Sequence, residues 1–390
     1  MKRRTPKTIV YVNYSPYENA GKILDYLLGQ YSVVCLFSFS FYRLSNRTSY
    51  NTLQIYKNGS LSETYPLFQI PVIPKLIFLF LPVQSIITFL DIVFYSRMLK
   101  AKFKTLDLYF TVNAFTAWVG LLLKKINVVK KTMFWVWDYY PLTKEKSIVM
   151  LMRHFYWQFD KVSSHSDIVV FQNKMLLDLR KRMGIYPRTS AYAIVPLGTD
   201  KIAYSYTHKK FTRNTLVFGF IGVLKKSQGI EIVFNNAAAL KKIYGEVRYE
   251  IVGSGPDEEY LKLIAKRSGI NATFHGYLEG ETFNEVLRAT DIGIATYVPD
   301  KGNVSPYGDP GKIKRYLSLG IPVITTDVHQ LAGDIEKSGA GMVVEFSSSR
   351  SFMGAVKTIL GKHASFSKQA YNFNQRFYYK KIYREMFRNI

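Results

Sequence analysis

Apolar runs alternate with amphipathic segments through the second half of the chain. Six of these runs have the length and composition of buried strands: LVFGFIG, YEIVG, ATFHG, DIGIATY, IPVITT and GMVVEF. The segment GIEIVFNNAAALKKIY is helical in pattern and places five apolar side chains on one face, those of Ile230, Val233, Phe234, Ala237 and Leu240. Continuous apolar strands that alternate with such helices predict a doubly wound parallel sheet covered on both faces, over about residues 199–365.

The first half of the chain shows the same alternation less regularly, with strand-like runs TIVYVN, SVVCLF, LDLYFT, KTMFWVW and DIVVFQ. The break between the halves falls near SAYAIVPLGTDKIAY, where a strand ends in Pro-Leu-Gly-Thr-Asp. We therefore expect an N-terminal domain over residues 1–198 and a C-terminal domain over residues 199–365. Residues 366–390 read as an aromatic and basic helical tail that packs back across the domains.

One apolar stretch, Leu76 to Tyr95, approaches the roughly 20 residues that span a bilayer. Pro82 and Asp91 interrupt it, and the basic run RMLKAKFK follows it, so that the whole segment covers about residues 76–104. Three interpretations stay open: a membrane-spanning helix, a buried helix, and a helix that dips into one leaflet with its basic residues on acidic headgroups. The third is favoured over spanning, because spanning would place two strands of one sheet on opposite sides of the membrane.

The charge balance of the chain is strongly basic. Its 53 lysine and arginine residues outnumber 28 aspartate and glutamate residues, which gives a formal net charge of +25. This excess indicates an anionic partner: nucleic acid, an anionic membrane surface or a phosphorylated small molecule. Nucleic acid ranks last, because the basic residues do not concentrate in one helix or one arginine-rich stripe and the sequence contains no recognisable nucleic-acid-binding module.

Cysteine and histidine are sparse. The single cysteine, Cys35, lies in the apolar run SVVCLF and reads as a small buried residue of a protein in a reducing, cytoplasmic compartment. The six histidines are scattered, and none pairs with another at i, i+4 or with the cysteine. We therefore expect no protein-built metal site and no cofactor. The basic N-terminal segment carries only a short apolar run, so we also expect no signal peptide.

Candidate binding residues gather at one edge of the predicted C-terminal sheet. In open α/β sheets, ligands bind beyond the carboxyl ends of the strands. The first strand ends at Gly222 and is followed by a loop that carries Lys225 and Lys226. The second strand is followed by Gly253 and Gly255, which let a ligand approach the backbone. The third leads into YLEGE, which begins with Tyr277.

The loop after the fourth strand, VPDKGNVSPYGDPGK, leads into a helix whose first turn offers free N–H groups and a partial positive charge. Pro310 suits the first helical position, Asp309 can cap the helix, Gly311 leaves room for a ligand and Lys312 adds a full charge. Each feature alone also fits a solvated loop, as does the lysine pair. Their convergence at one edge favours a phosphate-binding site.

A helical wheel drawn from Pro310 separates two faces of this helix. Ile313, Tyr316 and Leu317 share the face that we expect to lie against the sheet. Arg315 falls on the other face, near the anion-binding first turn. This arrangement predicts that Lys312 and Arg315 face a bound nucleotide; in the alternative they face solvent.

The segments IVGSGPDEEYLKLIAKRSGINATFHGYLEGETFNEVLRATDIGIATY and DPGKIKRYLSLGIPVITTDV together resemble the donor-binding half of glycosyltransferase family 4, the retaining GT-B enzymes, over about residues 190–362. The first half matches in outline: a strand–loop–helix with Gly21, then WVWDYYP and HSDIVVFQNKM. The resemblance implies an α/β GT-B fold, in which two Rossmann-like doubly wound domains face a cleft. It also implies a nucleotide-diphospho-sugar held mainly by the C-terminal domain, an acceptor on the N-terminal domain, no required metal and frequent docking on membranes.

The resemblance also implies roles for individual residues. Lys225 or Lys226, Lys312 and the backbone N–H groups of the loop would assist departure of the nucleoside diphosphate, with Asp138 and Asp309 as further catalytic candidates. The candidate nucleotide-sugar-binding residues are Gly21, Gly222, Gly253, Gly255, Tyr277, Tyr307, Gly308, Pro310, Gly311, Lys312 and Arg315.

Five positions of the sequence depart from the family pattern. Val223 and Gln228 stand where the family usually has an arginine and a lysine, and Trp137 replaces a histidine. The family's pair of glutamates falls on Tyr307 and Arg315. The expected function is a glycosyltransferase at the cytoplasmic face of the membrane, with a lipid-linked or polysaccharide acceptor in cell-envelope glycan synthesis. The departures motivate the alternative, a non-catalytic GT-B scaffold or regulator that retains a nucleotide-binding cleft.

Overall fold

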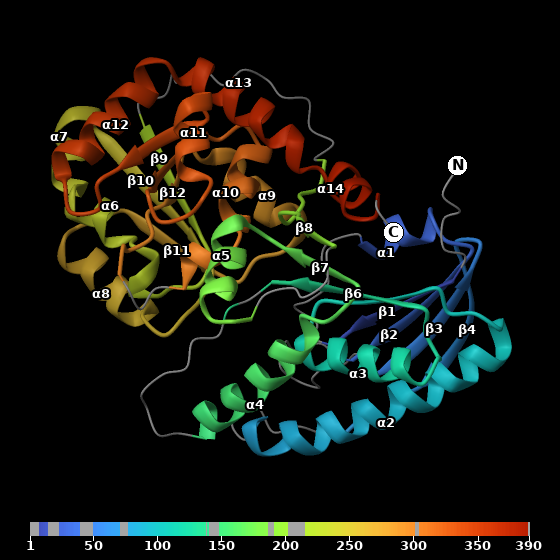
Figure 1. Cartoon of the computed structure of the whole chain (residues 1–390). Helices are drawn as coiled ribbons and strands as arrows, with labels where there is room; N and C mark the ends of the chain where they lie inside the picture. Colours follow the sequence, from blue (N-terminus) through green and yellow to red (C-terminus); the bar gives the residue numbers. More distant parts are fainter. Residues whose placement is uncertain are drawn as a thin grey trace. The chain divides into compact units, whose positions relative to one another are not determined.

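The computed structural model of the chain divides into two compact units (Figure 1). The first comprises Met1–Gly198 together with Tyr379–Ile390, and the second comprises Thr199–Tyr378. The structure describes residues 8–14, 23–39, 50–70, 77–137, 139, 148–185, 191–201, 215–300 and 304–388. The helical tail expected over residues 366–390 is therefore shared between the units rather than forming a separate segment.

The second unit is built on a six-stranded sheet in the order β11-β10-β9-β12-β13-β14. All of its strand pairs are parallel. The strands are β9 (Thr215–Ile221), β10 (Glu246–Val252), β11 (Ala272–Gly276), β12 (Ile292–Ala295), β13 (Val323–Thr326) and β14 (Gly341–Val344). All six match the apolar runs of the sequence, which confirms the predicted parallel sheet. The strand order reverses between β9 and β12, and this switch point is where such sheets bind ligands.

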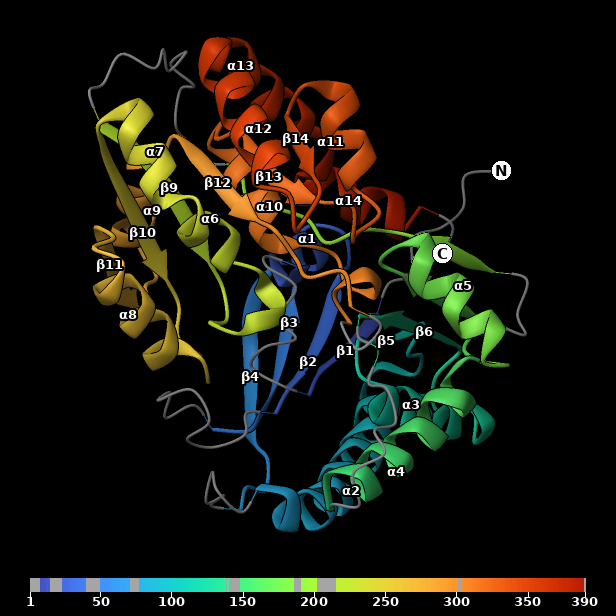
Figure 2. The ribbon, with the colours of Figure 1, turned by 90° about the vertical axis from the view of Figure 1, so that its left-hand side faces the viewer.

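Helices connect these strands and cover both faces of the sheet, as Figures 1 and 2 show. They are α6 (Glu231–Asn235), α7 (Ala237–Tyr244), α8 (Glu258–Arg267), α9 (Gly280–Ala289), α10 (Gly311–Ser318), α11 (Ala332–Ser338), α12 (Ser349–Gly361) and α13 (His363–Asn374). The apolar side chains form two separate clusters, one that contains Phe218 and Phe352 and one that contains Val252 and Leu317. Both faces are therefore closed to water, as continuous apolar strands require.

The helix predicted from GIEIVFNNAAALKKIY is two helices that meet at Asn236. The Asn236 side-chain amide donates to the Ile232 carbonyl oxygen at 2.7 Å, and this bond competes with the regular helical pattern. Four of the five side chains assigned to the apolar face are buried, and Ala237 is half-buried. The predicted face is correct although the helix is interrupted.

The first unit has an eight-stranded sheet in the order β4-β3-β2-β1-β5-β6-β7-β8. Its strands are β1 (Thr8–Asn13), β2 (Val33–Ser38), β3 (Thr52–Lys57), β4 (Ser60–Pro66), β5 (Leu108–Thr111), β6 (Lys131–Val136), β7 (Ile168–Phe171) and β8 (Tyr192–Ile194). The pairs are parallel except at one edge, where β3 and β4 run antiparallel. A purely parallel sheet was expected here, so the edge hairpin is a correction.

The signal for that hairpin is present in the sequence TLQIYKNGSLSETYP. Asn58 and Gly59 connect β3 to β4, with φ values of +49° and +83°. A two-residue Asn-Gly connection between strands is a strong hairpin signal, because both residues tolerate positive φ. The alternation of apolar runs and helices in the first half predicts parallel strands, but it does not extend to this edge of the sheet.

Six helices belong to the described part of the first unit: α1 (Ile23–Leu28), α2 (Ile77–Phe103), α3 (Ala114–Lys125), α4 (Ile148–Ser163), α5 (Lys174–Arg182) and α14 (Tyr379–Met386). Helices α2, α3 and α4 lie side by side on one face of the sheet (Figures 1 and 2). Helix α14 returns to this unit and packs on α1, with the rings of Tyr26 and Tyr383 5.5 Å apart.

Helix α2 is the segment with the open membrane interpretations. It is long and apolar enough to cross a membrane by length and composition, and 22% of its most apolar window is buried. Its inner side, with Ile92 and Leu99, packs into the core of the first unit. A stripe of large apolar side chains on the opposite side is exposed: Leu79, Val83, Ile86, Leu90 and Phe94. The interpretation as a plain buried helix is therefore wrong.

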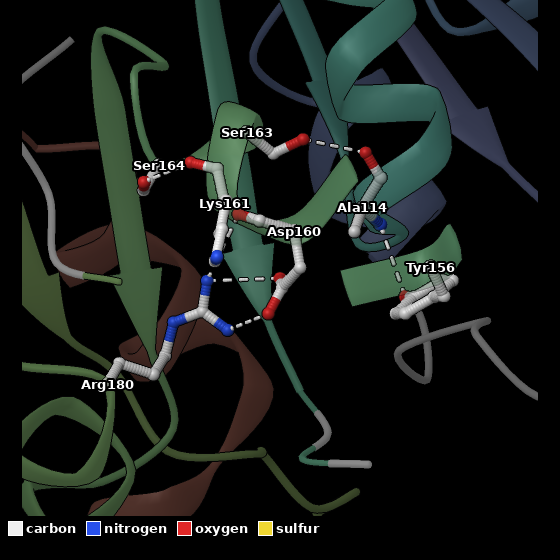
Figure 3. A network of polar contacts seen from close by, with 7 residues as sticks. All are labelled: Ala114, Tyr156, Asp160, Lys161, Ser163, Ser164 and Arg180. Atoms are coloured by element: carbon white, nitrogen blue, oxygen red, sulfur yellow. Dashed lines mark hydrogen bonds and ion pairs between the residues drawn. The ribbon is translucent and has the colours of Figure 1, made fainter. Parts of the chain in front are cut away.

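Helix α4 exposes a second apolar stripe while polar contacts fix its other side (Figure 3). The exposed side chains include Ile148, Leu151 and Phe155. On the inner side, buried Arg180 of α5 forms an ion pair with Asp160, and its second nitrogen donates to the other carboxylate oxygen at 3.0 Å. These bonds hold α4 in one orientation, which keeps its apolar stripe outward.

Candidate functional site

A cavity of about 420 Å³ lies at the carboxyl edge of the second unit's sheet, next to the strand-order switch. Its wall is formed by the ends of β9 and β10, the residues after β11, the start of α9 and the first turn of α10. The lining residues are Ile221, Gly222, Val223, Val252, Gly253, Ser254, Tyr277, Leu278, Phe283, Gly311, Lys312 and Arg315. Six of the predicted nucleotide-sugar-binding residues meet here: Gly222, Gly253, Tyr277, Gly311, Lys312 and Arg315.

Two glycines allow the ends of β9 and β10 to come together beside this cavity. Gly222 and Gly253 have φ values of +130° and +129°, which residues with a Cβ rarely adopt. A Cβ on Gly253 would lie 2.0 Å from the Gly222 carbonyl oxygen. Gly255 has a related role outside the cavity, because its Cβ would lie 2.3 Å from the Leu224 carbonyl oxygen. These glycines permit close approach of two backbone segments to each other.

Lys312 places its ammonium group inside the unit beside the cavity. Its Nζ donates to the side-chain oxygen of Gln228 at 2.6 Å and lies 4.6 Å from the ring centroids of Phe220 and Tyr297. Within the described part of the chain, no carboxylate forms an ion pair with it. Burial lowers the pKa of Lys312 to about 7, because removing the charged amine from water is unfavourable.

Arg315 lies one turn further along α10 and also faces the cavity. Its guanidinium group stacks over the ring of Phe283 at 5.2 Å and donates to the side-chain oxygen of Asn284. The lining residues of the cavity include two cationic side chains and no carboxylate. The cavity therefore suits an anion better than a neutral ligand or a cation.

The first turn of α10 adds backbone donors to this cationic wall. The first N–H groups bonded within the helix are those of Ile313 and Lys314, both to the Pro310 carbonyl oxygen. Among the described residues, the N–H groups of Gly311 and Lys312 have no partner. This is the anion-binding arrangement expected at a helix N-terminus.

The lysine pair after β9 does not reach this cavity. Lys225 and Lys226 are exposed, and neither lines it. The Lys226 Nζ lies 4.6 Å over the ring of Tyr260, and its backbone N–H donates to Asp257 at 2.8 Å. Lys226 instead borders a separate cavity of about 490 Å³ beside Glu231. The structure thus places half-buried Lys312 beside the cavity and leaves the lysine pair at the surface.

Asp309 and Pro310 differ from their expected roles. Pro310 is the residue before the helix, which begins at Gly311, and no side chain caps it. The Asp309 carboxylate forms an ion pair with Lys314, and both side chains are almost fully buried. Tyr307 lies in a short 3₁₀ turn (Ser305–Tyr307) and Gly308 follows it, and both lie outside the cavity lining.

The predicted apolar face of α10 is correct, because Ile313 is buried and so are its partners on that face, Tyr316 and Leu317.

Two predicted site residues, Gly21 and Asp138, lie outside the described residues. Trp137, which stands where the resemblance places a histidine, packs perpendicular to Trp135 with ring centroids 5.3 Å apart. Sequence reasoning did not identify Gln228 or Tyr297 as neighbours of Lys312. Gln228 comes from the loop after β9, and Tyr297 lies at the β12 end of the long connection between β12 and α10.

Residues 215–362 match the family model described as glycosyl transferases group 1. No curated protein matches the chain in sequence. Similar solved structures include the Anabaena protein HepE in complex with UDP, with 15% identity, a TM-score of 0.68 and coverage of 98% of this chain and 99% of that one. Sucrose-phosphate synthase from Thermosynechococcus elongatus has 14% identity and a TM-score of 0.65, and the match covers 98% of this chain and 100% of that one.

A UDP-forming α,α-trehalose-phosphate synthase from Burkholderia vietnamiensis is similar to the same extent, with 12% identity, a TM-score of 0.65 and coverage of 98% and 100%. At these identities the structural likeness establishes the fold, which is GT-B with two parallel-sheet α/β domains. The family match covers most of the second unit, including the residues that line the cavity. Together these findings support a glycosyltransferase of the GT-B superfamily.

Proposed function

We propose that the protein is a glycosyltransferase that takes its sugar from a nucleotide-diphospho-sugar bound in the cavity beside α10. The observation that carries the proposal is the cationic wall of Lys312 and Arg315 next to the free N–H groups of Gly311 and Lys312. A diphosphate supplies the two adjacent negative charges that this wall can hold. The match of the surrounding residues to a glycosyltransferase family and the UDP bound to a similar structure agree with it.

In the proposed chemistry, the oxygen of an acceptor hydroxyl forms a bond to the anomeric carbon of the donor sugar as the bond from that carbon to the nucleoside diphosphate breaks. The hydroxyl proton leaves with the diphosphate. Negative charge grows on the leaving diphosphate in the transition state, and donors fixed in place stabilise it without reorganisation. Lys312 and Arg315 supply this stabilisation in the proposed scheme, which uses no metal. Retention of the anomeric configuration and membership of glycosyltransferase family 4 are part of the proposal through the resemblance of residues 190–362.

Calorimetric titration with nucleoside diphosphates tests the donor site. We expect micromolar binding of at least one of UDP, GDP or ADP to the full chain. The variant Lys312→Gln should weaken it at least tenfold, about 1.4 kcal/mol, while leaving the fold intact. Lys225→Gln is the matched control, because Lys225 is an exposed lysine outside the cavity. If none of the three nucleotides binds, or if the two variants weaken binding equally, the assignment of the cavity fails.

The second part of the proposal is peripheral contact with an anionic membrane on the cytoplasmic side, with a lipid-linked or polysaccharide acceptor in envelope glycan synthesis. The apolar stripes of α2 and α4 lie on neighbouring helices and form what we call the helical apron, namely Leu79, Val83, Ile86, Leu90, Phe94, Ile148, Leu151 and Phe155. Arg97 and Lys104 are exposed near the end of α2 and complement acidic headgroups. Lys102 is not available for this role, because it forms an ion pair with Glu63.

The depth of insertion follows from the two sides of α2. Ile92 and Leu99 are fully buried in the core of the first unit, so this side packs on protein. The exposed side carries Phe94, which is 66% exposed, and Ile86, which is 61% exposed. A helix with one protein-facing side and one apolar exposed side suits shallow insertion into one leaflet.

Flotation with liposomes tests this contact. We expect the chain to float with vesicles that contain an anionic phospholipid and to remain largely unbound with purely zwitterionic vesicles. The triple variant Ile86→Gln, Leu90→Gln and Phe94→Gln should reduce the bound fraction at least tenfold, because each side chain contributes about 1.5–3 kcal/mol when buried. The matched control changes Ile243 and Leu263, exposed apolar side chains of the second unit, to Gln. Equal recovery of both variants with the vesicles would contradict the proposal.

A non-catalytic scaffold is the second candidate function. It is favoured by one observation, the ion pair between Asp309 and Lys314, which occupies a carboxylate that was expected to face the donor sugar. Hydrolysis of a bound nucleotide sugar separates the two candidates. Slow release of the nucleoside diphosphate that disappears in Lys312→Gln supports the enzyme, whereas tight binding without any release supports the scaffold.

A further inference from the structure

We infer, on the basis of the proposed function, that Gln228 is a positioning residue for Lys312, and that Lys312 takes up a proton when a diphosphate binds in the cavity. Gln228 accepts a hydrogen bond from the Lys312 Nζ through its side-chain oxygen, at 2.6 Å. The two residues are 84 positions apart in sequence and come from opposite sides of the strand-order switch.

The turn that carries Gln228 is held rigidly. It is a 3₁₀ turn (Lys226–Gln228) followed by Gly229 in the left-handed region, with φ of +67°. A Cβ on Gly229 would lie 1.6 Å from the Thr296 carbonyl oxygen, so this position accepts no other residue without a backbone shift. The Thr296 hydroxyl donates to the Gly229 carbonyl oxygen at 2.7 Å. The side-chain oxygen of Gln228 is therefore presented from a fixed backbone.

The surroundings of the Lys312 ammonium group are unusual for a structural lysine. Two aromatic rings, Phe220 and Tyr297, flank it at 4.6 Å, and its hydrogen-bond partner is a neutral amide. A buried structural cation normally has a carboxylate partner, and within the described residues Lys312 has none. A bound anion would supply the missing charge.

The protonation state follows from the same surroundings. Burial lowers the pKa of Lys312 to about 7, so that at pH 8 most free molecules carry a neutral amine. An adjacent diphosphate favours the charged form and raises that pKa again. Binding at pH 8 is therefore coupled to the uptake of up to one proton.

Other titratable groups near Lys312 keep one charge state through this range. Burial raises the pKa of Tyr297 well above its ordinary value, and Asp309 acts in the same direction. Burial and the charge of Lys312 lower the pKa of His329 to about 4. Arg315 remains cationic. The change between pH 7 and 9 therefore belongs to Lys312.

Two further lysines, Lys225 and Lys226, lie on the loop that carries Gln228, and both are exposed to solvent. The terminal phosphate of a nucleoside diphosphate has a pKa near 6, as a phosphate monoester does, so its charge is constant above about pH 7.5. The proposed proton uptake can therefore be measured between pH 7.5 and 9 without a contribution from the ligand.

The first test measures proton uptake by calorimetry of the full chain with UDP, GDP or ADP, whichever binds, in buffers of different ionisation enthalpy. At pH 8 we expect uptake of between half a proton and one proton, and an affinity that falls about tenfold per pH unit between pH 7.5 and 9. Gln228→Glu should abolish the uptake, because a carboxylate at this place keeps Lys312 charged before the ligand arrives. Gln30→Glu, an exposed site in the first unit, is the control and should leave the uptake unchanged.

The second test exchanges the two side chains. Lys312→Gln alone should weaken diphosphate binding at least tenfold, and adding Gln228→Lys should recover most of the loss, because the ammonium and amide groups then exchange places. A purely structural Gln228 predicts no recovery. Thermal unfolding of each variant confirms that it is folded.

Three outcomes separate the hypotheses. Binding with proton uptake and recovery by the exchange supports the inference. Binding without uptake, or without recovery in a folded double variant, overturns the inference and leaves the proposed function standing. No binding of any of the three nucleotides overturns both.

Discussion

Lys312 and Lys314 lie two residues apart on α10, yet they lie on different sides of this helix and have different partners. Lys314 points inward, forms an ion pair with Asp309 and lies 4.3 Å over the ring of Phe377. Lys312 points toward the cavity and has a neutral amide as its partner. One lysine has its counter-charge within the chain, and the other lacks it.

The difference shows how a short helix can separate stability from binding. Burying a charge costs several kcal/mol unless a partner offsets it. At Lys314 burial still lowers the pKa, but the permanent pair with Asp309 offsets part of the cost. At Lys312 the cost remains in the free protein, and the proposed diphosphate would relieve it. The inner side of α10 thus has a structural ion pair, and the outer side carries the proposed ligand site.

The largest expected effect comes from breaking the inner pair. Asp309→Ala should lower the free energy of unfolding by about 3–5 kcal/mol, because it leaves the buried Lys314 charge without a partner. Urea denaturation of the full chain measures this loss. The double variant Asp309→Ala with Lys314→Met should recover most of it. A single variant as stable as the parent would show that the pair contributes no stability.

The second-largest expected effect is a gain in stability, and it concerns the outer side of α10. In the free protein Lys312→Met should raise the unfolding temperature by several degrees at pH 6, because the methionine removes the cost of burying an amine. The lysine pKa is lower in the folded state than in the unfolded state, so the parent gains stability as pH rises above about 7. The advantage of the variant should therefore shrink between pH 7 and 10. Calorimetric unfolding over this range checks it, and a pH-independent difference would contradict the assignment.

The smallest expected effect concerns Arg315. Arg315→Ala should weaken diphosphate binding severalfold, less than Lys312→Gln, because its guanidinium group is already held by Asn284 and Phe283. Arg267→Ala, on the exposed side of α8, is the control. A loss larger than that of Lys312→Gln would move the main cation of the site from Lys312 to Arg315.

The sheet of the second unit and the apolar face of α10 could be predicted from the sequence, because both depend on local patterns. Each strand is a short apolar run, and Ile313, Tyr316 and Leu317 follow helical spacing. The position of Lys314 could not be predicted in this way. A lysine in a helical pattern normally faces water. Its burial depends on Asp309 and Phe377, of which the second lies far along the chain.

The distinction between local patterns and contacts between distant residues also applies to the cations of the cavity. Sequence reasoning placed Lys312 correctly at the edge of the sheet, but it also assigned the diphosphate to Lys225 or Lys226. The conformation of the turn decides between them, because Gly229 directs Gln228, and not the lysine pair, toward α10. A backbone conformation set by one close approach to Thr296 cannot be deduced from residue type alone.

The first unit shows where a local signal was present and overlooked. The Asn58–Gly59 pair predicts the edge hairpin. On α4, the spacing of Ile148, Leu151 and Phe155 also predicts one apolar face, but only the neighbouring helices show that this face stays exposed.

The second unit begins and ends at neighbouring points, because Thr199 and Tyr378 form a parallel bridge and the Thr199 N–H donates to the Phe377 carbonyl oxygen at 2.8 Å. It is therefore a continuous insertion into the first unit, whose last helix α14 follows it in sequence. A block whose two ends meet can be replaced by a homologous block without rerouting the surrounding chain. Recombination at these two points would exchange the unit with the proposed diphosphate site between proteins as a single block, so that the proposed donor preference and the proposed membrane contact would evolve independently.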